Sequence, residues 1–545
     1  MTNLLWKPTR YFTEQSLLKK YMEWLFVKKG LYFRDYDDLW DWSVTDLEAF
    51  WESIYQFFDI QSDTLYREVL DLPQPGPPHW GMIGTHWFEG ATVNYARHIF
   101  RHKNPQNPAL IFQAEGREPL QMSWAVLENQ VAAVATYLLE AGVEKGDRVA
   151  AILPNTPENV VAFLATASIG AIWSSCSPDL DTTSVVDRFG QIEPKVLLVA
   201  DGYFYDGKLI RKSDSIRELR QQLLSVKRVI WVPYADLPTT ERLEGSDLWI
   251  EVVQTPNFGL EFEPIPFNDP LWILYSIDTT GQPNAITHSV GGCLLEHLKA
   301  LGLHQDVRPG ERYFWYSTTG EMMWNYSLGA MLLGATLVLY EGSPTYPSLN
   351  TLWDLAERAH IQHFGMDSAY YMTCMHRNAS SATQPIKTHS LPALRTIGST
   401  GSPLSAEGFR WVNESVKKDV WPISLSGSIG ICSGFVGGCP FMPVYEGETQ
   451  RRLLGCKLDA VDENGLAIRG EPGEMVIREP MPSMPIYFWN DRSNERYRSR
   501  YFESFPNVWR QGDSIEISDH NGVICHGRSK VIGDYKGILI GTAEN

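Results

Sequence analysis

Apolar strand segments alternate with helical patterns over much of the chain, and this alternation restricts the folds open to it. In chain order the segments are a helix at 123–140, a strand at 148–153, a helix at about 157–169, a strand ending near 173, and strands at 196–200, 229–232, 271–275, 313–317 and 337–340. Strands that alternate with helices form parallel sheets, because each crossover helix returns across a face of the sheet. The pattern therefore predicts the α/β class.

The length of the chain and the segments after Trp421 refine this prediction. A chain of 545 residues is too long for a single core, so two doubly wound lobes are expected. After Trp421 the segments become shorter, as at 473–478 and 514–517, which predicts a small β subdomain. The fold class expected is thus α/β, with two doubly wound lobes and a small β subdomain.

The first 98 residues are rich in aromatic side chains. Ser43 followed by Asp46 predicts a capping box that opens a helix. Residues with helical spacing then share one face, namely Leu47, Phe50, Trp51, Ile54, Phe57 and Phe58. Such a stripe is more often core than ligand site, so we interpret this region as a buttress on the main body.

Composition excludes several classes of function. The net charge of −18 disfavours nonspecific binding to nucleic acid or to an anionic membrane. The seven cysteines are scattered and form no Cys-x2-Cys pair, so neither a disulfide framework nor a zinc site is predicted. The longest apolar candidate, 324–340, is short for a membrane span and contains polar residues, and residues 1–10 do not lead into a signal peptide. A cytoplasmic location is expected.

The segment from Leu271 to Leu295 indicates a binding loop. An apolar run ends abruptly in the polar loop 276–284, which carries Thr, Gly and Pro, and an apolar pattern then resumes. Loops of this kind can hold polyphosphate through backbone N–H groups and hydroxyls. The Walker pattern Gly-x4-Gly-Lys-Ser/Thr is not found, which argues against a P-loop NTPase.

Several ordered blocks of the chain resemble one family, the AMP-forming acyl-CoA synthetases. The blocks are ILYSIDTTGQPNAITHS, FWYSTTGEMMWNY, LRTIGSTGSPL, PMPSMPIYFWND and WRQGDSIEI, and the resemblance runs from about Trp6 to Glu544. It implies a ligase that activates a short β-keto acid with ATP and Mg²⁺ and transfers it to CoA. It also implies an N-terminal segment at 1–98, an AMP-binding domain at 99–529 and a hinge stub at 530–545.

The resemblance assigns roles to individual positions. It places the nucleotide and its phosphates at Ser276, Thr279, Thr280, Gly281, Gly401, Ser402, Pro403, Asp513 and Arg528. It places the acyl pocket at Gly320, Met323, Trp324 and Gly437. An acid suits the position of Asp513, because one carboxylate can accept hydrogen bonds from both ribose hydroxyls.

The phosphate loop departs from the family pattern Ser-Ser-Gly-Thr-Thr-Gly-x-Pro-Lys at Ile277, Asp278 and Asn284. A carboxylate about 4 Å from a phosphate oxygen costs on the order of 4 kcal/mol at an effective dielectric constant of about 20. Replacing the family lysine by Asn284 removes an attraction of similar size. Binding of ATP, Mg²⁺ and CoA is therefore expected to be weak, and weaker for ATP than for AMP.

Departures also affect the metal and the lid. The family carries Gly-Thr-Asp or Thr-Glu where this chain has Ile429 and Gly430, so the Mg²⁺ carboxylate is missing and no metal ligand is predicted. The hinge position is Lys530, and Leu539 replaces a family arginine. The sequence ends at Asn545, so the C-terminal lid domain and its adenylation lysine are expected to be absent, which leaves no catalytic residue intact.

Three interpretations stay open at this point. The chain is an acid–thiol ligase, or an inactive truncated homologue that binds ligands or partners without turnover, or a half-enzyme whose lid is a separate polypeptide. Family resemblance favours the first, and the departures favour the second.

Overall fold

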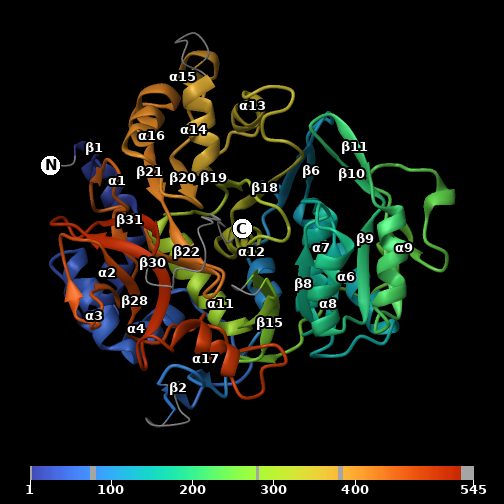
Figure 1. The fold of residues 1–545 in the computed structure, drawn as a ribbon, viewed down its shortest axis with the longest axis horizontal. Helices are drawn as coiled ribbons and strands as arrows, with labels where there is room; N and C mark the ends of the chain where they lie inside the picture. Colours follow the sequence, from blue (N-terminus) through green and yellow to red (C-terminus); the bar gives the residue numbers. More distant parts are fainter. Residues whose placement is uncertain (1–2, 74–80, 278–280, 378–383, 530–545) are drawn as a thin grey trace.

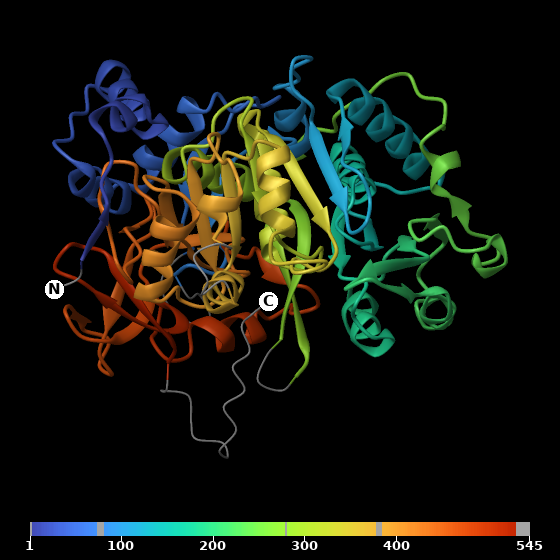
Figure 2. The same ribbon diagram turned by 90° about the horizontal axis from the view of Figure 1, so that it is seen from above.

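The computed structural model describes residues 3–73, 81–277, 281–377 and 384–529. Figures 1 and 2 show the lobe that contains α6 to α9 on one side of the molecule and the N-terminal helices on the other. No helix in the described part of the chain is long and apolar enough to cross a membrane.

The first lobe is built on a sheet of eight strands in the order β13-β12-β9-β7-β8-β15-β16-β29. Their bounds are Asp247–Leu248, Arg228–Val232, Val196–Ala200, Arg148–Ile152, Ile172–Cys176, Pro270–Ile277, Pro283–Ser289 and Tyr487–Phe488. Neighbouring strands are parallel from β13 to β15, whereas β16 and β29 run antiparallel to their neighbours. Strand β9 spans the residues that the sequence predicts.

Helices cover both faces of this sheet. Along β7 the side chains alternate, with Val149 and Ala151 in one hydrophobic core and Ala150 and Ile152 in another. The first core also receives helices α6 (Trp124–Glu140) and α7 (Pro157–Ser168), and the second receives α8 (Thr182–Ile192) and α9 (Ser213–Gln222). A strand buried on both faces is apolar throughout, which explains why the sequence shows these strands so clearly.

The second lobe contains seven strands in the order β21-β20-β19-β17-β18-β5-β6. Their bounds are Trp421–Ser424, Thr396–Thr400, His363–Asp367, Arg312–Trp315, Thr336–Glu341, Leu110–Ala114 and Leu120–Met122. All neighbours are parallel except β5 and β6. Helices that pack on it include α12 (Met322–Leu328), α13 (Thr351–Arg358), α14 (Ser368–Arg377) and α16 (Ala406–Trp411).

A separate antiparallel sheet follows in the order β27-β26-β28-β30-β31. Its strands are Ala467–Ile468, Leu458–Val461, Gly473–Ile477, Trp509–Ile517 and Val523–Arg528. Two doubly wound lobes and a small β subdomain are thus present, and the predicted fold class is confirmed.

The predicted capping box at Ser43 is wrong. Ser43 lies inside helix α3 (Tyr36–Thr45), where its hydroxyl donates to the Trp40 carbonyl (2.7 Å) and accepts from the Gly455 N–H (2.9 Å). The next helix, α4 (Leu47–Phe57), is capped by Asp46, whose carboxylate accepts the Ala49 N–H at 3.2 Å. A buried partner at Gly455 uses the serine hydroxyl, so the aspartate provides the cap.

The predicted apolar face of α4 is buried except at Phe57, which is half-buried. Phe50 and Trp51 pack so closely on Gly455 that a Cβ there would lie 2.6 Å from Phe50 and 2.8 Å from Trp51. The Tyr36 hydroxyl of α3 donates to the Arg452 carbonyl at 2.7 Å. Helices α3 and α4 therefore brace the segment that connects the second lobe to the small sheet.

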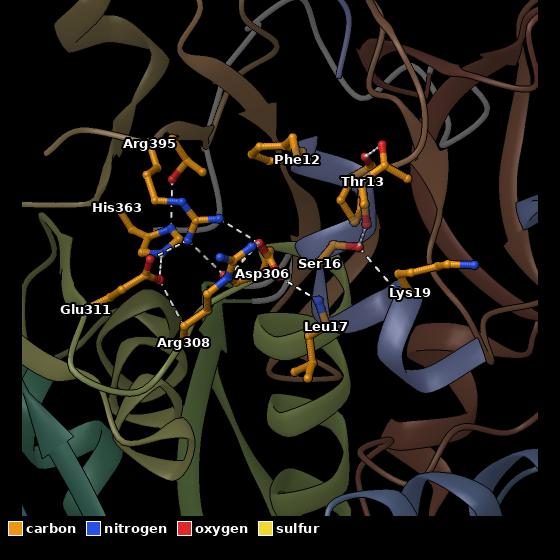
Figure 3. Close-up of polar contacts among 12 residues, drawn as sticks. Phe12, Thr13, Ser16, Leu17, Lys19, Asp306, Arg308, Glu311, His363 and Arg395 are labelled. Atoms are coloured by element: carbon orange, nitrogen blue, oxygen red, sulfur yellow. Dashed lines mark hydrogen bonds and ion pairs between the residues drawn. The ribbon is translucent and has the colours of Figure 1, made fainter. Parts of the chain in front are cut away.

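A partly buried ionic cluster connects the first helices to the second lobe (Figure 3). We call it the Asp306 clasp, and it consists of Asp306, Arg308, Glu311, His363 and Arg395. Asp306 accepts hydrogen bonds from Arg308, from Arg395 (2.6 Å) and from the Leu17 N–H (2.8 Å) at the start of α2 (Leu17–Lys29). The Glu311 carboxylate lies 2.8 Å from His363 Nε2 and 2.5 Å from the Arg395 guanidinium. The cluster lies at the amino ends of β17, β19 and β20.

The Asp306 clasp is expected to make the fold sensitive to acid through Glu311. Burial raises the pKa of Glu311, but the charges and hydrogen bonds of His363 and Arg395 outweigh it and lower the pKa to about 2. The unfolded value is near 4.5. Because the folded pKa is the lower one, the ionised form stabilises the fold above pH 4.5, and this contribution disappears as the pH falls toward 2.

We expect Glu311→Gln to flatten the pH dependence of the unfolding midpoint between about pH 4.5 and 2.5. Glu463→Gln, at an exposed position, is the control and should leave the slope unchanged. Circular dichroism melts at several pH values measure both slopes. Equal slopes in Glu311→Gln and the unaltered protein would contradict the assignment.

Candidate functional site

A cavity of about 390 Å³ lies where the second lobe meets the small β sheet. It is lined by the carboxyl ends of neighbouring strands of that lobe, at Trp315 (β17), Asp367 (β19), Thr400 (β20) and Ser424 (β21). Ligands of open α/β folds bind outside the carboxyl ends of the strands, and this volume is within the range of small-molecule sites. The cavity is therefore the candidate functional site.

The turn after β20 forms one wall. Gly401, Ser402 and Pro403, which the family resemblance assigns to the nucleotide, all line the cavity. Gly401 has a φ of +82°, a left-handed conformation that a side chain disfavours. Thr400 anchors the turn, because its hydroxyl donates to the Leu425 carbonyl at 2.9 Å.

The small sheet supplies the opposite groups. Asp513 in β30 is paired in register with Arg528 in β31, and the guanidinium lies 3.5 Å from the carboxylate. Both side chains line the cavity. The backbone before Asp513 is fixed by the Gly512 N–H, which donates to Glu474 at 3.0 Å, and by the φ of +89° at Gly512. A carboxylate and a guanidinium are thus held side by side at one rim.

The predicted phosphate loop contributes none of its described residues to this cavity. Ser276 is buried at the end of β15, opposite Asn284 in β16, and its hydroxyl has no hydrogen-bond partner among the described residues. Gly281 has a φ of +84° and open space around it. Thr279 and Thr280 lie outside the described residues, as do Asp278, Lys530 and Leu539.

Of the four residues predicted for the acyl pocket, Met323 lines the cavity and the others do not. Trp324 is 2% exposed and belongs to the core, where its indole N–H donates to Asn155 at 3.1 Å and its ring stacks on Trp173. Gly320 packs on the backbone of Ser177, and Gly437 packs between Leu425 and Leu453. These three positions shape the core behind the cavity.

The family's metal does not fit the residues at 429 and 430. Ile429 lines the cavity with an apolar side chain. Gly430 donates its N–H to the Ser428 hydroxyl and accepts a hydrogen bond from His288, and a Cβ there would lie 2.7 Å from the Tyr501 hydroxyl and 2.9 Å from the Trp509 ring. Those two rings stack at 3.5 Å. Within the described ranges no cluster of three or more His, Cys, Asp or Glu is placed to hold a metal.

Restoring an acid at this position is therefore expected to damage the fold and not to create a metal site. Gly430→Asp should cost about 1–3 kcal/mol of stability, because the new side chain displaces the Tyr501–Trp509 stack. Gly190→Asp is the control, since nothing lies within 4 Å of a Cβ at Gly190. Thermal unfolding with and without Mg²⁺ measures the effect. A Gly430→Asp protein that is as stable as the control and is further stabilised by Mg²⁺ would overturn the assignment.

Two acidic residues of the cavity were not singled out from the sequence, although the resemblance places the segment 318–324, which contains one of them, on the acyl side of the pocket. Among the described residues that line it, Glu321, Asp367 and Asp513 carry carboxylates and Arg528 carries a positive charge. Glu321 follows β17 and Asp367 ends β19, so their positions at strand ends could have pointed to them. The lining is thus acidic on balance, which disfavours a triphosphate and is compatible with a ribose or an amide.

Comparison with known proteins gives concordant matches. The family model for AMP-binding enzymes matches residues 99–488, and the model for the acetyl-coenzyme A synthetase N-terminus matches residues 36–99. The chain is 40% identical to acetoacetyl-coenzyme A synthetase of Rhizobium meliloti (strain 1021) and 37% identical to acetoacetyl-CoA synthetase of Mus musculus. A solved structure, acetoacetyl-CoA synthetase from Streptomyces lividans, superposes with a TM-score of 0.91 at 41% identity.

The extent of these matches bears on the prediction of truncation. The two sequence matches cover 99% of this chain and 81% and 80% of the relatives, and the structural match covers 97% of this chain and 80% of the other. Because nearly all of this chain is matched, its description as truncated is not confirmed.

Proposed function

The chain belongs to the family of AMP-binding enzymes, and on this premise we propose that it is an acid–thiol ligase of the acetoacetyl-CoA synthetase type. In the first step acetoacetate attacks the α-phosphate of ATP, which forms acetoacetyl-adenylate and releases diphosphate. In the second step the CoA thiol displaces AMP and forms acetoacetyl-CoA. ATP, acetoacetate and CoA are the small-molecule partners in this proposal.

One observation supports the proposal most directly. The cavity brings together residues far apart in the sequence that the family resemblance assigns to one nucleotide, namely Gly401 to Pro403, Asp513 and Arg528. In this arrangement the turn after β20 holds the base and the Asp513 carboxylate accepts the ribose hydroxyls. Met323, at the start of α12, faces the acid. Adenylation and thioester formation depend mainly on such positioning, so a preformed cavity is the central requirement.

The residues at positions 429 and 430 do not provide a Mg²⁺ ligand. Mg²⁺ in such a reaction neutralises phosphate charge, but position 430 offers no ligand and is packed against Tyr501 and Trp509. Any Mg²⁺ would therefore arrive with ATP. This observation favours a second candidate function, a protein that binds the acid or a nucleotide without turnover. A separate lid polypeptide stays a prediction.

The cellular location is part of the proposal. All seven cysteines are free, and six of them are buried. Free thiols persist in a reducing compartment, which supports the cytoplasm.

A direct assay tests the proposed function. The 545-residue protein is incubated with acetoacetate, ATP, Mg²⁺ and CoA, and acetoacetyl-CoA and AMP are followed by mass spectrometry. We expect both products in equal amounts. A parallel reaction without CoA should give diphosphate only in stoichiometric amount and no free AMP, because AMP stays in the bound adenylate until the CoA thiol displaces it. Binding of AMP without any product would favour the second candidate.

A further inference from the structure

Glu321 is a carboxyl group of the cavity, in a segment that the family resemblance places on the acyl side, but neither the resemblance nor the comparisons give its side chain a role. It stands directly before helix α12 and lines the cavity beside Met322 and Met323. Its Oε2 accepts hydrogen bonds from the Ser317 hydroxyl at 2.8 Å and from the Thr318 N–H at 3.0 Å. In the described part of the chain both hydrogen bonds to this carboxylate go to Oε2, and none is found at Oε1. One oxygen is thus fixed, and the other is available to a ligand.

The surroundings of Glu321 suit a short acid with one polar group. Trp315, Met322 and Met323 provide apolar walls of the cavity near this side chain. The segment containing Glu321 cannot retreat easily, because a Cβ at the adjacent Gly320 would lie 3.0 Å from the Ser177 backbone nitrogen. A carboxyl group fixed on one side in a largely apolar wall can discriminate strongly between ligands that do and do not pair with it.

The charge state of Glu321 depends on its neighbours. Burial raises the pKa of this carboxyl, the hydrogen bonds from Ser317 and Thr318 act in the opposite direction, and the charges of Asp367 and Asp179 raise it further. The Tyr316 phenol also lies within electrostatic reach. The protonated form is favoured relative to an exposed glutamate, and it is a hydrogen-bond donor.

We propose that Glu321 determines acid specificity by donating a hydrogen bond from Oε1 to the β-keto oxygen of the bound acid. This inference rests on the proposed function, which supplies a β-keto acid as the substrate. A fatty acid of the same length has no oxygen at that position and leaves the donor unpaired, which costs binding free energy. In its ionised form Glu321 cannot donate and repels the acid's own carboxylate.

Binding experiments test the inference independently of turnover. Acetoacetate and butyrate are titrated separately into the 545-residue protein over the whole pH range in which it stays folded, with ligand-observed NMR as the readout. We expect acetoacetate to bind at least about tenfold more tightly than butyrate at the lower pH, in line with one paired donor. The preference should shrink as the pH rises and Glu321 ionises.

Glu321→Gln separates this role from a structural one. A glutamine amide can accept from Ser317 and Thr318 and still donate to the keto oxygen, but it does not titrate. The variant should therefore keep the preference for acetoacetate over the whole pH range, although Asp367, Asp179 and Tyr316 are unchanged. Glu471→Gln, at an exposed position, should behave like the unaltered protein.

The outcomes are distinguishable. Equal affinities of the unaltered protein for the two acids at low pH, or failure to bind acetoacetate, would overturn the inference. The inference would also be overturned if the preference of Glu321→Gln for acetoacetate fell with rising pH as it does in the unaltered protein. If the protein binds acetoacetate in preference to butyrate but forms no thioester, the role of Glu321 is supported and the ligase proposal is contradicted. If it forms thioesters equally well from both acids, the ligase proposal is supported and the role of Glu321 is contradicted. If Glu321→Gln does not fold, the pH profile of the unaltered protein decides.

Discussion

Replacing Arg395 by methionine is expected to lower the free energy of unfolding by about 3–5 kcal/mol. The guanidinium lies 2.6 Å from Asp306 and 2.5 Å from Glu311, and the Asp306 side chain has no solvent exposure. Methionine fills similar space but leaves both carboxylates short of a cation, and the desolvation cost of a buried charge then counts in full. Arg395 also lies over the Phe12 ring at 5.8 Å, so the contact with the first helices is weakened as well.

Chemical denaturation followed by tryptophan fluorescence measures this loss. Arg10→Met is the matched control, because Arg10 is 93% exposed and its ion pair with Glu14 spans 3.8 Å. Exposed pairs contribute at most about 1 kcal/mol, so the control should be nearly neutral. A loss below about 1 kcal/mol for Arg395→Met would show that Arg308 and His363 suffice to neutralise the clasp.

The main sheets could be predicted from the sequence because their strands are buried on both faces. Such strands are continuous apolar runs, and the residues of β9 illustrate this, since every one of them is buried. The antiparallel pairing of β15 with β16 was not predictable in the same way. It depends on Ile277 meeting Pro283 across the loop, and local apolar patterns do not specify strand direction.

Side-chain direction limited the prediction of the site. Met323 and Trp324 are adjacent in the sequence, yet the helix turns one into the cavity and the other into the core beside Trp173. Ser43 and Asp46 are both good capping residues. Ser43 does not cap the helix, because its hydroxyl accepts the N–H of Gly455, which is distant in the sequence. Glu321 and Asp367 each follow or end an apolar strand, but the sequence does not show that they share one cavity, because they meet only when β17 and β19 become neighbours.

Replacing Asp513 by alanine is expected to weaken AMP binding by about ten- to a hundredfold. Hydrogen bonds to a charged group contribute about 1.5–3 kcal/mol, and about 1.4 kcal/mol corresponds to a factor of ten in affinity. Asp513 lines the cavity beside Arg528, at the rim where the ribose is proposed to lie. The backbone at Gly512 is held by Glu474, so the loss should reflect the missing carboxylate and not a displaced strand.

A nucleotide without ribose hydroxyls isolates the contribution of Asp513. The unaltered protein should bind 2′,3′-dideoxy-AMP about as weakly as Asp513→Ala binds AMP, and the variant should not distinguish the two nucleotides. Removing the carboxylate also releases Arg528 toward phosphate, but this effect is common to both nucleotides and cancels in the comparison. Asp459→Asn, in the same sheet but paired with Arg478 at 2.7 Å outside the cavity, is the control. If the variant still prefers AMP over the dideoxy compound as strongly as the unaltered protein does, the ribose is bound elsewhere, and the cavity does not hold the nucleotide in the proposed orientation.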